Sequence, residues 1–265
     1  MTARAQTPTR VWVEQIMGTV VSIHAVGTGG DEPGVAQAVA DCCAQLREVE
    51  RVFSTYRDDS DVSRLRRGEL SLEDADPRVA VVADACQAAE RATGGRFSAT
   101  WQGWFDPTGY VKGWSVEEAA RTFLAPLIDR PGIVAVGINA GGDVRVFTDT
   151  SSDWSWHIAI ADPRRHGEVL ATLDVRNGAV ATSGTAERGL HIVDPATGST
   201  ARHTLSATVV ADDLTTADVW ATAAVVARDL DWVREAPLTA GMIVDRGGRV
   251  RRFLSGVEIE VVAAA

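Results

Sequence analysis

Asp218 and Thr222 lie four residues apart in a stretch, residues 217–229, whose pattern predicts a helix. This spacing puts the carboxylate and the hydroxyl on one helix face, one turn apart. Two hard oxygen donors so placed can share one Mg²⁺ ion with water, phosphate oxygens and a backbone carbonyl. The alternative is an ordinary first helical turn, in which the aspartate favours the helix dipole and the threonine bonds back to the chain.

A pair of glycines gives a second candidate site, at the end of a strand predicted over residues 133–140. Gly141 and Gly142 stand between Asn139 and Asp143. Glycine tolerates positive φ, so backbone N–H groups can turn inward here and hold an anion such as a pyrophosphate. A plain hairpin turn or bulge is the alternative.

A third candidate is the segment Asp106-Pro-Thr-Gly-Tyr-Val-Lys-Gly113, which precedes a helix predicted over residues 115–124. A helix start with the ammonium group of Lys112 beside it is a suitable phosphate site. The segment does not have the GxxxxGK[ST] pattern of a P-loop, and the sequence has no GxGxxG fingerprint. An exposed turn with a solvated lysine is the alternative.

A fourth candidate is a predicted strand that ends in Ala181-Thr-Ser-Gly184 and is followed by His191. The hydroxyls of Thr182 and Ser183 and the bare backbone of Gly184 suit close contact with a ligand. Histidine exchanges a proton readily near neutral pH, as a general base must. The alternatives are a β-turn at Asp194-Pro-Ala-Thr-Gly198 and a structural histidine.

Met17 and Tyr56 are two further candidates, for contact with flat rings. Met17 precedes a glycine, and its polarizable sulfur could lie against a ring system. Tyr56 lies in a polar turn and could stack on a base. Ordinary core and turn roles are the alternatives for both.

The elements that must position these residues predict an α+β fold, because helices dominate the first half and strands the second. We expect a flexible N-terminus over residues 1–10 and a single domain over residues 11–265, with a mainly antiparallel sheet and flanking helices. The predicted helices cover residues 34–52, 79–92, 115–124 and 217–229. The predicted strands cover residues 19–25, 133–140, 154–161, 168–175 and 206–211, with two more near Met242 and Val257, and those between 133 and 175 are expected in one sheet.

Composition excludes some classes of function. The chain has 265 residues, 45% of them hydrophobic, and a formal net charge of −10. Such a charge argues against nucleic acid or an anionic membrane surface as the partner. No apolar run is long enough for a signal peptide or a transmembrane anchor, so we expect a cytoplasmic protein. Cys42, Cys43 and Cys86 form no CxxC pair and are expected to be buried structural thiols.

In their order and spacing, these clusters together resemble the ApbE family, the FAD:protein FMN transferases. The resemblance extends over nearly the whole chain. Its segments are Met17-Gly-Thr19, FSTYRDDSDVSRL, DPTGYVKGW, NAGGDV, ATSG, HIVDPATG and the helix that carries Asp218 and Thr222. Many members carry a signal peptide and a lipid-anchoring cysteine. This sequence has neither, which implies a cytoplasmic target.

The resemblance implies an α+β fold with FAD lying across the protein and Mg²⁺ at its pyrophosphate. It implies that Asp218, Thr222 and the backbone carbonyl of Gly109 bind the metal ion, that Met17 faces the isoalloxazine and that Tyr56 faces the adenine. The remaining residues implied around FAD are Asp106, Lys112, Asn139, Gly141, Gly142, Asp143, Thr182, Ser183 and Gly184.

The implied reaction is attack by a threonine or serine hydroxyl of a target flavoprotein on the FMN-side phosphorus of FAD, with release of AMP. His191 is the candidate base, and a nearby aspartate, Asp106 or Asp143, is the alternative. Two other functions remain open at this point. One is an FAD pyrophosphatase, in which water replaces the hydroxyl, and the other is a non-catalytic FAD-binding protein.

Overall fold

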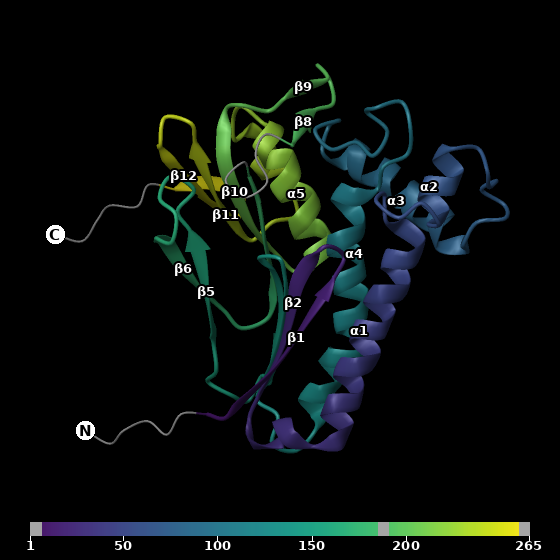
Figure 1. Cartoon of the computed structure of the whole chain (residues 1–265). Helices are drawn as coiled ribbons and strands as arrows, with labels where there is room; N and C mark the ends of the chain where they lie inside the picture. Colours follow the sequence, from purple (N-terminus) through teal and green to yellow (C-terminus); the bar gives the residue numbers. More distant parts are fainter. Residues whose placement is uncertain (1–6, 185–190, 260–265) are drawn as a thin grey trace.

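A computed structural model describes residues 7–184 and 191–259 of the chain. In this part of the chain nine strands form one sheet in the order β1-β2-β3-β4-β7-β10-β11-β12-β13, and every neighbouring pair is antiparallel. Helices cover one face of this sheet, and a separate hairpin, β5–β6, covers part of the other (Figure 1). The arrangement confirms the predicted α+β class.

The strands of the large sheet are β1 (Thr9–Ile16), β2 (Thr19–Val26), β3 (Ala135–Ala140), β4 (Asp143–Thr148), β7 (Gly178–Gly184), β10 (Thr204–Ala211), β11 (Ala240–Asp245), β12 (Val250–Leu254) and β13 (Val257–Ile259). The hairpin is β5 (Trp156–Ala161) and β6 (Val169–Val175), and β8 (Val193–Asp194) pairs with β9 (Ser199–Thr200). The α-helices are α1 (Pro33–Phe53), α2 (Asp61–Arg66), α3 (Pro77–Ala92), α4 (Thr108–Ala119) and α5 (Leu214–Val226).

The alternating side chains of β4 show which face of the sheet packs against the helices and which against the hairpin. Val146 packs in the apolar cluster under the β5–β6 hairpin, whereas Phe147 packs against the cluster formed with α1, α4 and α5. Successive side chains of a strand point to opposite faces, so Asp143 and Arg145 share the helix-facing side with Phe147. Both charged residues are buried there.

The β5–β6 hairpin corrects one expectation. Residues 154–161 and 168–175 do form an antiparallel pair, but they do not join the sheet of β3. The reason is that β4 pairs directly with β7, which leaves the hairpin no edge at that place. It packs face-on instead, through Ile160 and Val175.

Helix α4 begins at Thr108 and not at 115, so Gly109 and Lys112 are helical rather than part of a preceding turn. The helix starts where Asp106 Oδ1 accepts hydrogen bonds from the Thr108 backbone N–H at 3.0 Å and from its hydroxyl at 2.5 Å. Beyond Ala119 the chain continues in a π-helical turn to Leu124. The correction places the lysine one turn inside the helix.

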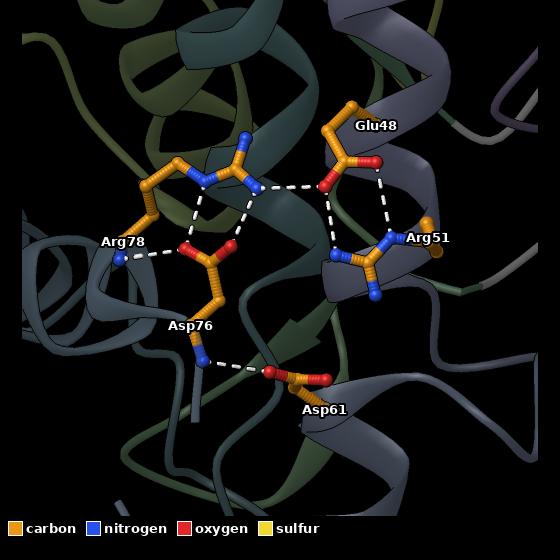
Figure 2. A network of polar contacts seen from close by, with 5 residues as sticks. All are labelled: Glu48, Arg51, Asp61, Asp76 and Arg78. Atoms are coloured by element: carbon orange, nitrogen blue, oxygen red, sulfur yellow. Dashed lines mark hydrogen bonds and ion pairs between the residues drawn. The ribbon is translucent and has the colours of Figure 1, made fainter. Parts of the chain in front are cut away.

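A network of charged groups joins α1 to the starts of α2 and α3 (Figure 2). Arg78 donates to Asp76 through Nε and Nη2, and Nη2 also reaches Glu48 of α1 at 3.3 Å. Asp61, at the start of α2, accepts a hydrogen bond from the Asp76 backbone N–H at 2.7 Å. The network fixes both ends of the loop between α1 and α2, and this loop carries Tyr56.

The three cysteines are buried and free, as predicted. Burial raises the pKa of the Cys42 and Cys86 thiols to about 12, so neither forms a thiolate readily. None of the described helices is both long and apolar enough to span a bilayer. The boundary predicted at residue 10 falls inside β1, which starts at Thr9, while residues 1–6, 185–190 and 260–265 lie outside the described part.

Candidate functional site

A cleft of about 780 Å³ gathers most of the predicted site residues. We divide its lining into two sets. The framework residues lie on helices and on the large sheet or its β3–β4 turn: Gly109, Lys112, Gly141, Gly142, Asp143, Thr182, Ser183, Gly184, Ser206, Asp218 and Thr222. The loop residues come from connecting segments and include Tyr56, Arg96, Trp101, Asp106, Asp162, Arg164, His166 and His191.

Lys112, the only lysine in the sequence, lies at the centre of the framework set. Its ammonium group forms an ion pair with Asp143 and lies 3.1 Å from Asp218 Oδ2. Both aspartates are buried, with 2% and 5% of their surface exposed. Since a buried charge without a partner is costly, one ammonium shared by two carboxylates stabilises all three groups in place.

Gly113 explains how α4 and α5 come close enough for these contacts. Its backbone N–H donates a hydrogen bond to Asp218 Oδ2 at 3.0 Å. A Cβ at this position would lie 2.7 Å from the Cβ of Asp218 and 2.9 Å from the carbonyl oxygen of Leu214. Any larger residue would therefore push the two helices apart.

The paired glycines form a two-residue hairpin turn between β3 and β4, since Ala140 pairs with Asp143. Both have positive φ, 62° at Gly141 and 99° at Gly142, as such turns require. The Gly142 N–H donates to Asn139 Oδ1 at 2.8 Å. The hairpin-turn alternative is thus found, both glycines also line the cleft, and the anion contact stays a prediction. Asn139 stabilises the turn and is not one of the described lining residues.

The end of β7 brings hydroxyl groups beside α5. Ser183 Oγ lies 3.1 Å from Thr222 Oγ1, and the Thr182 backbone N–H donates to Asp143 Oδ1 at 3.0 Å. Asp218 and Thr222 line one cleft, as their spacing predicted. The first-turn alternative for Asp218 is wrong, because α5 starts at Leu214 and Asp213 accepts the capping hydrogen bond.

The loop residues differ in exposure, since Asp162 is buried while Tyr56, Trp101 and His191 are exposed. Tyr56 is 91% exposed, and His191 is also exposed at the cleft, where it has an interaction partner. Asp106 lines the cleft while capping α4 through the hydrogen bonds to Thr108. Tyr56, one of the two residues predicted to contact flat rings, lines the cleft.

Met17 is not one of the described lining residues. It occupies the β1–β2 turn with φ of 55°, and its Sδ accepts a hydrogen bond from Ser115 Oγ at 3.5 Å. Its half-buried side chain packs against two core clusters. The flavin contact implied for it stays a prediction.

Sequence reasoning missed Arg96, Trp101, Arg164 and His166 at the cleft. Arg164 is held by Asp162, whose oxygens accept from its guanidinium at 2.6 and 2.8 Å, and it donates to the Gly248 carbonyl at 2.9 Å. These hydrogen bonds hold the pKa of Asp162 at about 2. The signal in the sequence is weak, because a polar hairpin tip such as Asp-Pro-Arg-Arg-His is typical of any exposed turn.

Carboxylates slightly outnumber cations in the described lining of the cleft, so its charge is not positive. Among the described lining residues, the carboxylates of Asp106, Asp143, Asp162 and Asp218 face the cations of Arg96, Lys112 and Arg164. No group of three or more His, Cys, Asp or Glu in the described part could by itself hold a metal ion. A metal ion here would need hydroxyl, carbonyl or ligand oxygens to complete its coordination.

The chain was compared with known proteins. The model of the ApbE family matches residues 17–106 and 102–242. Among solved structures, the ApbE protein of Thermotoga maritima is similar at 22% identity, with a TM-score of 0.78 over 92% of this chain and 97% of that one. The flavinyl transferase ApbE of Pseudomonas stutzeri is similar at 19% identity, with a TM-score of 0.73 over 92% and 93%.

The flavin transferase ApbE of Vibrio cholerae is similar at 18% identity, with a TM-score of 0.71 over 94% of this chain and 97% of that one. At such identities the likeness shows a shared fold. A comparison with curated proteins gives no match.

Proposed function

This chain belongs to the ApbE family, and on that premise we propose that it transfers FMN from FAD to a threonine or serine hydroxyl of a target flavoprotein, releasing AMP. One observation carries the proposal. The only lysine, two buried carboxylates, the Gly141-Gly142 turn and the hydroxyl end of β7 converge in one cleft. Its volume of about 780 Å³ suits a cofactor-sized ligand.

We propose that Mg²⁺ takes part, bound by Asp218, Thr222 and the carbonyl of Gly109. The donors are hard oxygens, which Mg²⁺ prefers, and it commonly uses one or two carboxylates together with substrate phosphates. The charge of the cleft supports this, because a pyrophosphate would enter a site where four carboxylates already outnumber three cations among the described lining residues. When bound, the ion would neutralise charge on the pyrophosphate.

The other framework residues would bind and orient the phosphates. The ammonium of Lys112 can donate to phosphate oxygens while Asp143 and Asp218 hold it in place. The hydroxyls of Thr182 and Ser183 lie on the same lining. Fixed donors placed before the reaction lower its barrier because they need no reorganisation.

Transfer requires an acceptor oxygen to form a bond to the FMN-side phosphorus while the bond from that phosphorus to the AMP oxygen breaks. The hydroxyl proton goes to a base. We propose His191, an exposed imidazole at the cleft, because histidine exchanges a proton readily near neutral pH. The two alternative aspartates each have a structural role. Asp106 accepts two hydrogen bonds from Thr108, and Asp143 binds Lys112 and the Thr182 N–H.

Tyr56 would stack on the adenine, and the isoalloxazine would lie toward Met17. The 91% exposure of Tyr56 leaves its ring face free for stacking. The cytoplasmic location and a cytoplasmic target stay predictions, which cell fractionation would check.

The test incubates the protein with FAD, Mg²⁺ and a flavoprotein domain that presents an acceptor threonine. We expect in-gel flavin fluorescence of the acceptor and an equal amount of AMP, and neither in the presence of EDTA. An acceptor with Thr→Ala is the control. AMP without labelled acceptor would identify a pyrophosphatase instead, and FAD binding without AMP would identify a non-catalytic protein.

A further inference from the structure

A second contact among three elements lies deeper in the fold than the cleft. Glu117 of α4 faces Arg145 of β4, with Oε2 and Nε 2.8 Å apart, close enough for an ion pair although not aligned as a hydrogen bond. The same Glu117 Oε2 accepts a hydrogen bond from the backbone N–H of Leu214, the first residue of α5, at 2.8 Å. We call these three residues the buried junction.

The buried junction uses the same elements as the contacts of Lys112. Lys112 and Glu117 lie on α4, Asp143 and Arg145 on β4, and Leu214 and Asp218 on α5. Along β4 a step of two residues keeps the same face, and along α5 a step of four residues advances about one turn on the same side. The buried junction therefore joins the same three elements at a second level, five residues further along α4, two further along β4 and four back along α5.

Burial leaves the three residues of the junction few alternative arrangements. Glu117 is 3% exposed and Arg145 is 7% exposed. Arg145 is held on its other side, where Nη1 donates to the Gly178 carbonyl at 2.9 Å and the guanidinium lies 4.2 Å from the Phe147 ring centre. A buried ion pair contributes little net stability compared with apolar residues, yet it tolerates few arrangements.

Burying the Glu117 carboxylate also costs free energy of folding. Its Oε1 has no hydrogen-bond partner among the described residues, and Arg121 Nη1 lies 3.9 Å away. An apolar residue would avoid this cost at a helix–sheet contact. Through Oε2, the Glu117 carboxylate contacts both Arg145 of the sheet and the first N–H of α5. These contacts fix where α5 begins.

We propose that Glu117 is a positioning residue: through Arg145 and the Leu214 N–H it sets the spacing of α4, β4 and α5, and so holds Lys112 between Asp143 and Asp218. The role in catalysis rests on the proposed function. The placement of Lys112 does not, so it can be tested separately.

The single lysine makes that test direct. Lys112 is the one side-chain amine of the sequence, so its acylation by a reagent such as acetic anhydride can be followed by peptide mass spectrometry and compared with that of the chain terminus. Acylation requires the reagent to reach the Lys112 nitrogen, so it is slow while that nitrogen is held between Asp143 and Asp218. In Glu117→Gln we expect Lys112 to be acylated at least about fivefold faster relative to the terminus, because local opening becomes easier.

Phe253→Leu is the matched control, since it removes packing from the core in β12, away from the cleft. At temperatures where it is equally destabilised, it should leave Lys112 as slow as in the wild type. Equal rates in Glu117→Gln and the wild type would overturn the proposal, as would an equal acceleration in Phe253→Leu.

The double variant Glu117→Leu/Arg145→Met keeps the test valid if Glu117→Gln fails to fold, since apolar replacement of a buried pair restores stability. We expect its melting temperature to recover while Lys112 stays reactive. A return of Lys112 to wild-type protection would show that the pair is only structural.

Activity gives the second readout. In Glu117→Gln the kcat of AMP release should fall about tenfold or more, with the KM for FAD changed less, because positioning acts on the reacting geometry. A wild type that releases no AMP would refute the proposed function, yet the acylation rates would still decide the placement of Lys112.

Discussion

The framework residues and the loop residues of the cleft are held by different means. Asp143 and Asp218 are buried and joined through Lys112, and each comes from a different element of the core. The α1–α2 loop, which carries Tyr56, is held at its ends by the charged network, and Arg164 is held by Asp162 and by the Gly248 carbonyl. The framework residues lie on core elements, whereas the loop residues lie on segments that are fixed at a few points.

This difference assigns the two sets different tasks. Groups that must hold reacting atoms in a fixed geometry belong on rigid elements. Loops suit contacts that decide which ligand or partner binds, because they vary without disturbing the core. Substitutions in the framework should therefore lower rates, and substitutions in the loops, apart from His191, should mainly change binding.

The largest effect is expected for Asp218→Ala. It removes the charged metal ligand, so Mg²⁺-dependent AMP release should fall by at least about 1,000-fold while much of the FAD affinity remains. Thr222→Val should cost less, because water can replace one neutral ligand. AMP release is measured by chromatography across Mg²⁺ concentrations.

Asp213→Ala is the control for Asp218→Ala, because it removes the same charge from the same helix at its N-cap. It should lower stability by about 1 kcal/mol and leave AMP release nearly unchanged. Full activity of Asp218→Ala at low Mg²⁺ would disprove the metal assignment.

His191→Asn tests whether a loop residue takes part in the chemistry. We expect normal folding and FAD binding, with transfer about 100- to 10,000-fold slower, the usual loss for a positioned proton acceptor. His203→Asn, an exposed histidine that is not a described lining residue, is the control. A His191 variant that flavinylates the acceptor at the wild-type rate would direct attention to Asp106 or Asp143.

Tyr56→Ala should act on binding alone. Loss of one stacking partner costs about 1–3 kcal/mol, so the Kd for FAD should rise about 5- to 150-fold while FMN binding stays similar. Titration calorimetry with both flavins measures this, and Leu72→Ala, another exposed apolar residue, is the control. An equal loss of FMN affinity would remove the adenine contact from Tyr56.

The smallest effect is expected at the hairpin tip. Arg164 holds the pKa of Asp162 at about 2, below the ordinary value of 3.8, so the pair stabilises the fold above pH 3.8 and this contribution disappears as the pH falls toward 2. Asp162→Asn should be slightly less stable at pH 7, and its urea midpoint should converge with that of the wild type near pH 2. A gap that stays constant down to pH 2 would contradict this.

Much of the fold could be predicted because local patterns and tertiary structure agree. Alternation over 19–25 and the apolar spacing over 34–52 match β2 and α1 closely. The start of α4 could not be predicted, because Gly109 and Gly113 each disfavour a helix by about 1 kcal/mol. Only the close approach of α5 gives Gly113 a reason to be there.

The residues of the site, too, could be predicted only where the sequence itself gives a signal. Asp218, Thr222, Lys112 and Asp143 could be found because motif order indicated them. Glu117 could not, because a glutamate in a helix is expected to face solvent and its partner Arg145 is distant in the sequence. Trp101 and Arg96 reach the cleft only through the folding of the loops around them.

The pairing of β2 with β3 has a consequence for how the chain folds. Val26 pairs with Ala135, so residues 27–134, with helices α1 to α4, stand between two neighbouring strands. On a ribosome the β1–β2 hairpin would emerge early and wait without its sheet partner until β3 is made. Closing so long a loop is entropically costly and slows folding, so the helices must collapse first and bring the two strands together. The exposed apolar side chains of this hairpin, among them Val13 and Val20, make that waiting period the time at which the nascent chain is most prone to aggregate.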